Sequence, residues 1–279
     1  MSTTATITAT ETEWVPSGDV VANLNFYTPP ADGSRPYNII GSESITKNYG
    51  SEPLPVTIHD LRGNESSLSL DKEAFSFHTI PTSLKYNDFA DDQKIETVYY
   101  SEIKDIVRKH VSDVKEIFIF DHTVRRNTLN ALRGPVQVTH IDQTTKSGDA
   151  RLRHHFPDRA DELIRNGTRY QIINVWRPIN GVVVSHPLAF ADSSTVADDD
   201  LVAVAHKYPH YEGETAGVTH KEAQKWWYVS GQKDDEVTLI KCFDSHVGKD
   251  GSRRRVPHSA FEHPIVEVSA CGVFEFEFC

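Results

Sequence analysis

Short apolar runs separated by turn residues dominate the chain after residue 134. In order they are "PVQVTHID", "YQIINVW", "GVVVSH", "KWWYV", "EVTLIKCF", "VPHSAF" and "IVEVSACGVFEFEF". One helical insert, "DRADELIRNG", interrupts them and is expected to end at Gly167, because glycine accepts the left-handed conformation that closes many helices. Many short strands at roughly even spacing predict a barrel or a sandwich.

The first half of the chain carries a different pattern. Up to residue 80, Pro, Gly, Asp and Ser punctuate β-prone pieces such as "PVTIHDL" and "AFSFHTI", which predicts strands and loops. Residues 98–113 place apolar side chains near helical spacing, so we expect an amphipathic helix that covers one outer face of the barrel. The segment "EIFIFDH" that follows is typical of a buried strand.

These patterns predict one domain over residues 13–279. Residues 13–133 would supply strands, loops and the covering helix, and residues 134–279 would form the β-helix core. Residues 1–12 are rich in Ser, Thr and Ala, and we expect them to be disordered. A chain of 279 residues is long enough to bury one sizeable core.

Charge and composition narrow the partners. The formal net charge is −11, and the only dense basic run is Arg253–Arg255, so a nucleic-acid surface is not expected. The chain shows no secretory signal pattern and no apolar run of membrane-spanning length. Three cysteines lack metal-binding spacing and are read as reduced thiols. We therefore expect a cytoplasmic protein that acts on a small molecule without a membrane.

The segment "VTHIDQT" holds the candidate chemistry. In an extended strand residues i and i+2 project to the same side, so His140 and Asp142 converge. An imidazole and a carboxylate are two of the three ligands of a 2-His-1-carboxylate iron site. His258 is the candidate third ligand, because it follows Pro257 and starts a predicted strand far downstream. Fourteen histidines leave that choice open on spacing alone, and many His-x-Asp pairs are only surface hydrogen bonds.

Residues 55–261 resemble the fungal hydroxylase/desaturase family that includes the gibberellin desaturase and AsaB-like enzymes. A more distant resemblance is to the bacterial cephamycin methoxylation component CmcJ. The resemblance is carried by "PVTIHDLRGNE", "FDHTVRRN", "VTHIDQT", "YQIINVWRPINGVVVSHPLAFADSSTV", "KWWYV", "LIKCFDS" and "RRRVPHSAF". These blocks are rich in Trp, Arg and Pro, so the match is specific for the family but not for the substrate.

The resemblance implies a mainly β fold, a double-stranded β-helix of the jelly-roll or cupin-like kind with flanking helices. It implies a non-heme Fe(II) oxygenase of secondary metabolism that uses 2-oxoglutarate and O2 to hydroxylate or desaturate a small molecule. The family's His-x-Asp falls on His140 and Asp142, and its Pro-His falls on His258. The resemblance therefore supports the ligand set that spacing left open.

The co-substrate site is where this sequence departs from the family. The distal carboxylate of 2-oxoglutarate is usually clamped by an arginine or lysine after the second histidine, but residues 259–279 contain neither, and Ser269 stands at the family's arginine. Arg254, four residues before His258, and Arg177 of "NVWRP" are the candidate clamps. Arg177 could instead be a structural ion pair, and Arg254 part of a solvated rim.

Asn174 and Trp176 alternate on "YQIINVWRP", so one strand face could present an amide and an indole to the substrate. A tryptophan on a barrel strand is, however, more often core packing. Other functions stay open at this point: an iron enzyme that does not use 2-oxoglutarate, a non-catalytic accessory protein on the same fold or, less favoured, a zinc hydrolase. A homodimer is also possible, because the strand "VFEFEF" could pair across a sheet edge.

Overall fold

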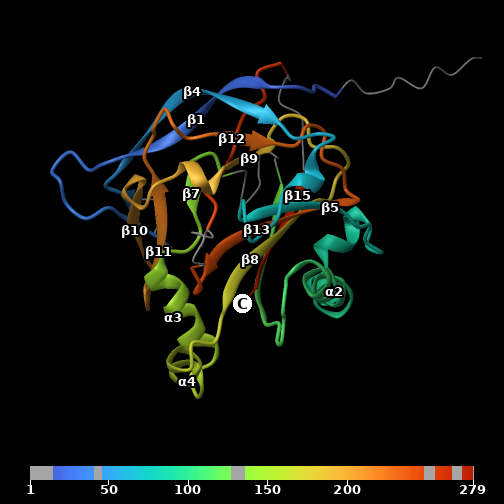
Figure 1. Cartoon of the computed structure of the whole chain (residues 1–279), viewed down its shortest axis with the longest axis vertical. Helices are drawn as coiled ribbons and strands as arrows, with labels where there is room; N and C mark the ends of the chain where they lie inside the picture. Colours follow the sequence, from blue (N-terminus) through green and yellow to red (C-terminus); the bar gives the residue numbers. More distant parts are fainter. Residues whose placement is uncertain (1–14, 41–45, 127–135, 248–254, 266–271, 279) are drawn as a thin grey trace, which may run out of the picture.

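Two β-sheets face each other, and side chains from both form a buried apolar cluster between them (Figure 1). The computed structural model describes residues 15–40, 46–126, 136–247, 255–265 and 272–278. Residues 1–12, which the sequence predicts to be disordered, lie outside the described residues. Arg254 and Ser269 lie outside them as well.

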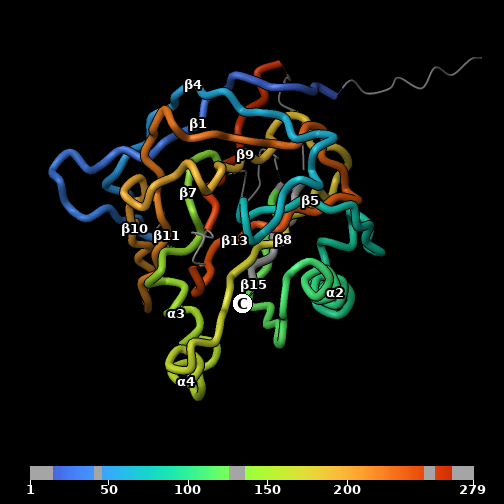
Figure 2. Tube along the Cα trace, viewed as in Figure 1, coloured from blue at the N-terminus to red at the C-terminus, as the bar shows by residue number. Residues whose placement is uncertain are grey.

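The larger sheet has ten strands, and its central members come from the second half of the chain. Across the sheet they are β1 (Val20–Thr28), β4 (Gly50–Asp60), β12 (Trp226–Tyr228), β9 (Leu188–Ala191), β14 (His258–Ala260), β7 (His140–Ile141), β11 (Glu212–Val218), β10 (Leu201–Lys207), β2 (Tyr37–Ile39) and β3 (Thr46–Lys47). β4 runs parallel to β12, and β2 runs parallel to β10. The N-terminal strands β1 and β4 thus lie beside β12 (Figure 2).

The smaller sheet has five antiparallel strands. Across the sheet they are β5 (Phe75–Thr79), β13 (Glu236–Asp244), β8 (Gln171–Pro178), β15 (Gly272–Phe278) and β6 (Ile119–Arg126). The predicted edge at "VFEFEF" is wrong, because β15 pairs with both β8 and β6. The strand-edge argument for a homodimer therefore fails.

Phe75 and Phe190 join the two sheets. Their rings stack with centroids 5.0 Å apart, and Phe75 belongs to β5 whereas Phe190 belongs to β9. Around them lies the inner cluster, a set of buried side chains that includes Ile172, Trp176 and Ile240. Burial of this apolar surface from both sheets stabilises the closed arrangement. The predicted jelly-roll architecture is confirmed.

A helical segment covers the outer face of the smaller sheet. It consists of α1 (Asp92–Lys94), a π-helical turn (Ile95–Tyr99) and α2 (Tyr100–His110). Ile103 and Val107 of α2 belong to the same buried cluster as Ile173 and Val175 of β8. The predicted covering helix is confirmed, although helical structure begins earlier and ends at His110.

The remaining helical pieces are short. They are α3 (Thr145–His155), α4 (Ala160–Arg165) and 3-10 turns at Glu65–Ser67, Tyr86–Ala90, Ser193–Thr195 and Asp198–Asp200. Gly167 follows α4 with φ +64°, as its sequence position predicts. α3 was missed by the sequence pattern, and it begins after Thr144, whose hydroxyl accepts a hydrogen bond from the backbone N–H of Ser147.

One predicted strand differs in burial. The sequence predicts a buried strand at "EIFIFDH", but β6 begins at Ile119 and its side chains from Ile119 to Arg125 are half-buried or exposed. The reason is its place at the edge of the smaller sheet, where one side of the strand has no neighbour.

Candidate metal centre

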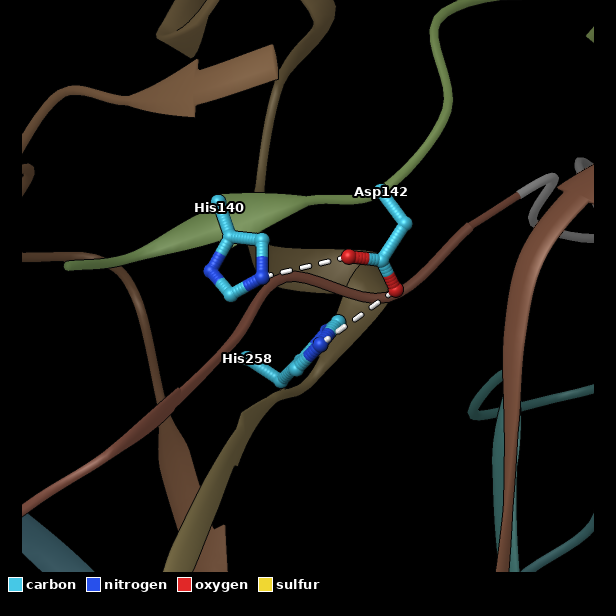
Figure 3. A group of neighbouring side chains, drawn as sticks. All are labelled: His140, Asp142 and His258. Carbon is cyan, nitrogen blue, oxygen red and sulfur yellow. Dashed lines mark ion pairs between the residues drawn. The ribbon is translucent and has the colours of Figure 1, made fainter. Parts of the chain in front are cut away.

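His140 and His258 are direct cross-strand partners. β14 pairs antiparallel with β7, and the register sets the two histidines opposite each other. Their ring centroids lie 4.6 Å apart. Two residues that are distant in the sequence therefore meet in the middle of the larger sheet, with Asp142 just beyond β7 (Figure 3).

The two imidazoles are oriented in the same way. Nδ1 of His140 lies 2.7 Å from the carbonyl oxygen of Val138, and Nδ1 of His258 lies 3.2 Å from that of Val256. A carbonyl oxygen can only accept, so each Nδ1 carries the proton and donates it. Each Nε2 therefore faces Asp142. In the metal-free protein a proton on Nε2 pairs with the carboxylate, and loss of that proton frees the lone pair for a metal ion.

Asp142 completes the group. Its Oδ1 lies 3.2 Å from Nε2 of His140, and its Oδ2 lies 3.5 Å from Nε2 of His258. One ligand atom from each of the three residues lies within 4.8 Å of the others. Ligands about 2.1 Å from one metal ion and at right angles are about 3 Å apart. The two imidazoles and the carboxylate, which contacts one histidine through each of its oxygens, are close enough together to hold a metal ion.

The carboxylate of Asp142 is held from the opposite sheet. Asn174 of β8 donates from Nδ2 to Oδ2 at 2.9 Å, and Sγ of Cys242 on β13 lies 3.1 Å from the same oxygen. Both donors are fully buried. Two donors on one oxygen fix the rotation of the carboxylate before any ligand binds.

Charge also favours the ionised form of Asp142. Burial by itself raises the pKa of this carboxyl group, but the neighbouring His258 and His140 and the Cys242 thiol together hold the pKa well below its usual value. The group is therefore a carboxylate at neutral pH, as a metal ligand must be.

Asn174 and Trp176 both lie on the inner face of β8, as the alternation predicts. Asn174 contacts Asp142, so its amide serves the carboxylate. Trp176 is 3% exposed and belongs to the inner cluster, which is the core-packing role. A substrate role for either residue stays a prediction.

Arg177 does not reach the site. It lies on the outer face of β8, is fully buried, and donates to the hydroxyl of Tyr99 at 2.6 Å. Its other nitrogens donate to the carbonyl oxygens of Asp234 at 2.6 Å and Ile80 at 2.7 Å. The expectation that Arg177 clamps a co-substrate is therefore wrong, because its guanidinium is committed to backbone and tyrosine oxygens on the far side of the sheet.

Cys242 is the site residue that the sequence did not single out. It is a buried free thiol on β13, two residues from Ile240 on the inner face. The alternation in "EVTLIKCF" is consistent with an inward thiol. Its contact with Asp142 depends on how the two sheets stack, which alternation does not give.

A cleft of about 1020 Å³, here called the mouth cleft, opens beside Asp142. Its walls come from β6, from α3 and from the ends of β10 and β11. Phe120 of β6, Arg151 of α3 and Tyr211 next to β11 are among the side chains that line it. The candidate metal centre therefore borders a space large enough for a small organic molecule.

Comparison with known proteins agrees with the fold. A family profile described as "Oxidoreductase/YMDC permease-like domain" matches residues 24–271. Oxidoreductase AN1597 of Emericella nidulans is 30% identical over 261 residues, covering 82% of this chain and 85% of that protein. The hydroxylase/desaturase efuI of Hormonema carpetanum is 30% identical over 276 residues, covering 89% and 90%.

An iron-enzyme relative appears both in sequence and in structure. The Fe(II)/2-oxoglutarate-dependent dioxygenase nvfI of Aspergillus novofumigatus is 30% identical over 231 residues, covering 80% of this chain and 81% of that protein. The solved structure of the iron and alpha-ketoglutarate-dependent endoperoxidase NvfI superposes with a TM-score of 0.81 at 23% identity, covering 94% and 97%.

The fold and the site together define a jelly-roll protein with a His-Asp-His group at the centre of its larger sheet. The chain belongs to the oxidoreductase family of that profile, and at 30% identity it is also a relative of oxidoreductase AN1597 and of the hydroxylase/desaturase efuI. The family resemblance read from the sequence is confirmed.

Proposed function

We propose that this protein is an Fe(II)- and 2-oxoglutarate-dependent oxygenase that hydroxylates or desaturates a small secondary-metabolite intermediate. His140, Asp142 and His258 are the three protein ligands of the iron. One observation carries the proposal: two Nε2 atoms and one carboxylate oxygen lie within 4.8 Å of one another, which fits a 2-His-1-carboxylate site with open positions. The names of nvfI and efuI support the metal, the co-substrate and the reaction class.

Bound Fe(II) would supply activation of O2, coupled to decarboxylation of 2-oxoglutarate and oxidation of a substrate C–H bond. The residues of the chain itself bind the iron and orient its ligands. Backbone carbonyls at Val138 and Val256 fix the two imidazoles, and Asn174 and Cys242 fix the Asp142 carboxylate. The packed inner cluster keeps bulk water away from this side of the site.

Arg254 remains the proposed clamp for the distal carboxylate of 2-oxoglutarate. Support comes from the sequence: it precedes His258 by four residues, which puts both on one face of an extended segment. Arg254→Ala should raise the Michaelis constant for 2-oxoglutarate far more than that for the substrate. Equal constants in the variant and the wild type would remove Arg254 from the site.

The decisive experiment is an anaerobic titration of Fe(II)-loaded protein with 2-oxoglutarate, followed by visible absorption. A charge-transfer band that saturates at about one equivalent is expected, because the 2-oxo acid would occupy two of the open iron positions. An iron-loaded protein without such a band would favour an iron enzyme that does not use 2-oxoglutarate. Succinate release on substrate addition is the matching turnover measurement.

Asp142→Ala provides the variant for that titration. It should abolish iron retention with little loss of folded structure, since Asp142 lines a cavity. Asp105→Ala is the matched control, because Asp105 is an exposed carboxylate on α2. If iron binds equally well to the wild type, Asp142→Ala and Asp105→Ala, the proposed ligand set is wrong, and an accessory role on this fold becomes the better explanation.

We also propose that the protein works in the cytoplasm. The support is its cysteine usage, since Cys242 is a buried free thiol that bonds to a carboxylate. Among the described residues, no helix is long and apolar enough to cross a membrane. Fluorescence microscopy of the tagged protein tests the location.

A further inference from the structure

Arg151 is a positively charged side chain that lines the mouth cleft. Within the part of the chain that the structure describes, it makes no hydrogen bond and no ion pair, and its guanidinium carbon lies 5.3 Å from the centroid of the Phe120 ring. Phe120 in turn packs against the inner cluster. The aromatic ring thus holds a charged group at the mouth of the barrel without neutralising it.

The geometry of α3 explains why Arg151 faces the cleft. Ser147, Arg151 and His155 are spaced four residues apart, so they form one row along the helix, and all three line the cleft. α3 begins three residues after Asp142. The row therefore leads away from the candidate metal centre along the wall of the same cavity.

Other cations near the cleft are already paired. Lys146 lies 3.7 Å from Glu214, and Glu214 also pairs with Arg35 at 2.9 Å. Arg153, on the same helix as Arg151, pairs with Asp161 at 3.1 Å and does not line the cleft. Arg151 differs from its neighbours because its charge is available to something that enters the cavity.

The groups beside Arg151 determine what charge a molecule bound in the mouth cleft should carry. Burial lowers the pKa of His155, and the charges of His154 and Arg151 lower it further, so His155 adds no positive charge at neutral pH. Asp121 also lines the cleft, and its carboxylate accepts a hydrogen bond from the backbone N–H of His122. Arg125 also lines the cleft but has a partner of its own. The guanidinium of Arg151 matches a singly charged, planar anion.

Aromatic side chains surround the rest of the cavity. Tyr208 and Tyr211 stack with ring centroids 4.2 Å apart, and both line the cleft at the turn between β10 and β11. Phe120 lies on the α3 side. Flat aromatic surfaces on two walls fit an organic molecule with an unsaturated or cyclic body.

From these observations we infer that the substrate is an organic acid whose carboxylate binds Arg151 while its apolar body occupies the mouth cleft. The inference rests on the proposed function, because it names the substrate class of that same site. The carboxylate anchors the molecule on α3, and the remainder extends toward His140, Asp142 and His258.

Binding of a probe pair tests the inference without turnover. Cinnamate carries an aromatic body and a carboxylate, and cinnamamide is its uncharged counterpart. Isothermal titration of metal-free protein should show that cinnamate binds more tightly than cinnamamide. Arg151→Gln should weaken the binding of cinnamate by about tenfold or more, because a charge-assisted hydrogen bond is lost. The binding of cinnamamide should not change. Arg153→Gln, on the same helix, should change neither.

Three results would overturn the inference: equal binding of the two probes to the wild type, no binding of cinnamate at millimolar concentration, or equal weakening by both arginine variants. A fourth concerns the co-substrate. If Arg151→Gln weakens the binding of 2-oxoglutarate in the iron titration but leaves the binding of cinnamate unchanged, Arg151 binds the co-substrate and the substrate assignment is wrong. If the proposed function itself is wrong, the Fe(II)-loaded wild type will show no charge-transfer band with 2-oxoglutarate, whatever the probes do.

Discussion

The side-chain amide of Asn174 donates a hydrogen bond to Oδ2 of Asp142 at 2.9 Å, across the space between the two sheets. The larger sheet supplies the candidate ligands, and the smaller sheet orients one of them. Removal of a hydrogen-bond donor to a metal ligand typically lowers metal affinity by about 10–100-fold. The relationship therefore makes iron affinity sensitive to the packing of one sheet on the other.

Asn174→Ala should weaken Fe(II) binding by about 10–100-fold, because Oδ2 of Asp142 loses a fixed donor. Equilibrium competition with a chelator measures the affinity. Asn23→Ala is the matched control, since Asn23 is exposed on β1. If both variants bind iron like the wild type, the amide does not orient the carboxylate.

Cys242 offers a finer test of the same carboxylate. Cys242→Ser keeps a donor beside Oδ2 and should retain iron, whereas Cys242→Ala removes the donor and should weaken binding. Circular dichroism checks that both variants are folded. Equal affinities of the serine and alanine variants would mean that the thiol only fills space.

Arg177→Met should lower the free energy of unfolding by about 3 kcal/mol, because the buried Tyr99 hydroxyl and the carbonyl oxygens of Asp234 and Ile80 lose their donor. Urea unfolding measures the loss. Arg108→Met, on the exposed side of α2, should change stability by less than about 0.5 kcal/mol. The 2-oxoglutarate affinity of the folded Arg177→Met protein should be unchanged, and a large loss there would restore Arg177 as a clamp.

Gly148→Ala should destabilise the protein although alanine favours helices by about 1 kcal/mol. A Cβ at this position would lie 2.7 Å from ring carbons of Phe243, so α3 or the ring must move, at a cost of about 1–3 kcal/mol. Phe243→Ala removes those ring carbons. A double-mutant cycle should therefore show positive coupling, and additive effects would exclude the clash.

Acid should destabilise the fold partly through His78. Burial, together with His110 and Lys109, lowers the pKa of His78 to about 4 from its ordinary value of 6.5. Between those two values the unfolded chain binds a proton that the folded chain does not, so stability falls as the pH falls from 6.5 to about 4. Urea midpoints across this range should show a smaller slope for His78→Asn than for the wild type. His210→Asn, at an exposed histidine, should leave the slope unchanged.

The alternation of side chains along a strand predicts which residues of β8 share a face. Asn174 and Trp176 are two residues apart and do share the inner face of β8. Arg177 is three residues from Asn174, so the same alternation already places its side chain on the opposite face. Treating Asn174 and Arg177 as lining one pocket therefore contradicted the period of a strand.

Pairing between distant segments could not be predicted in this way. The alternation in "VFEFEF" is the same for an edge strand and an interior strand, and only the backbone partners β8 and β6 distinguish them. The contact of Cys242 with Asp142 likewise depends on the stacking of two sheets. His258 was chosen correctly as a neighbour of His140 because the family resemblance supplied the long-range information that spacing lacked.

The placement of His140 and His258 on one rung of the β7–β14 ladder has a consequence for assembly. Those strands are joined through most of the second half of the polypeptide, so their pairing closes a long loop and forms late. A metal ion bound by both strands would stabilise their pairing and slow unfolding of the protein. Iron content should then govern how long the native state persists, as well as what it can oxidise.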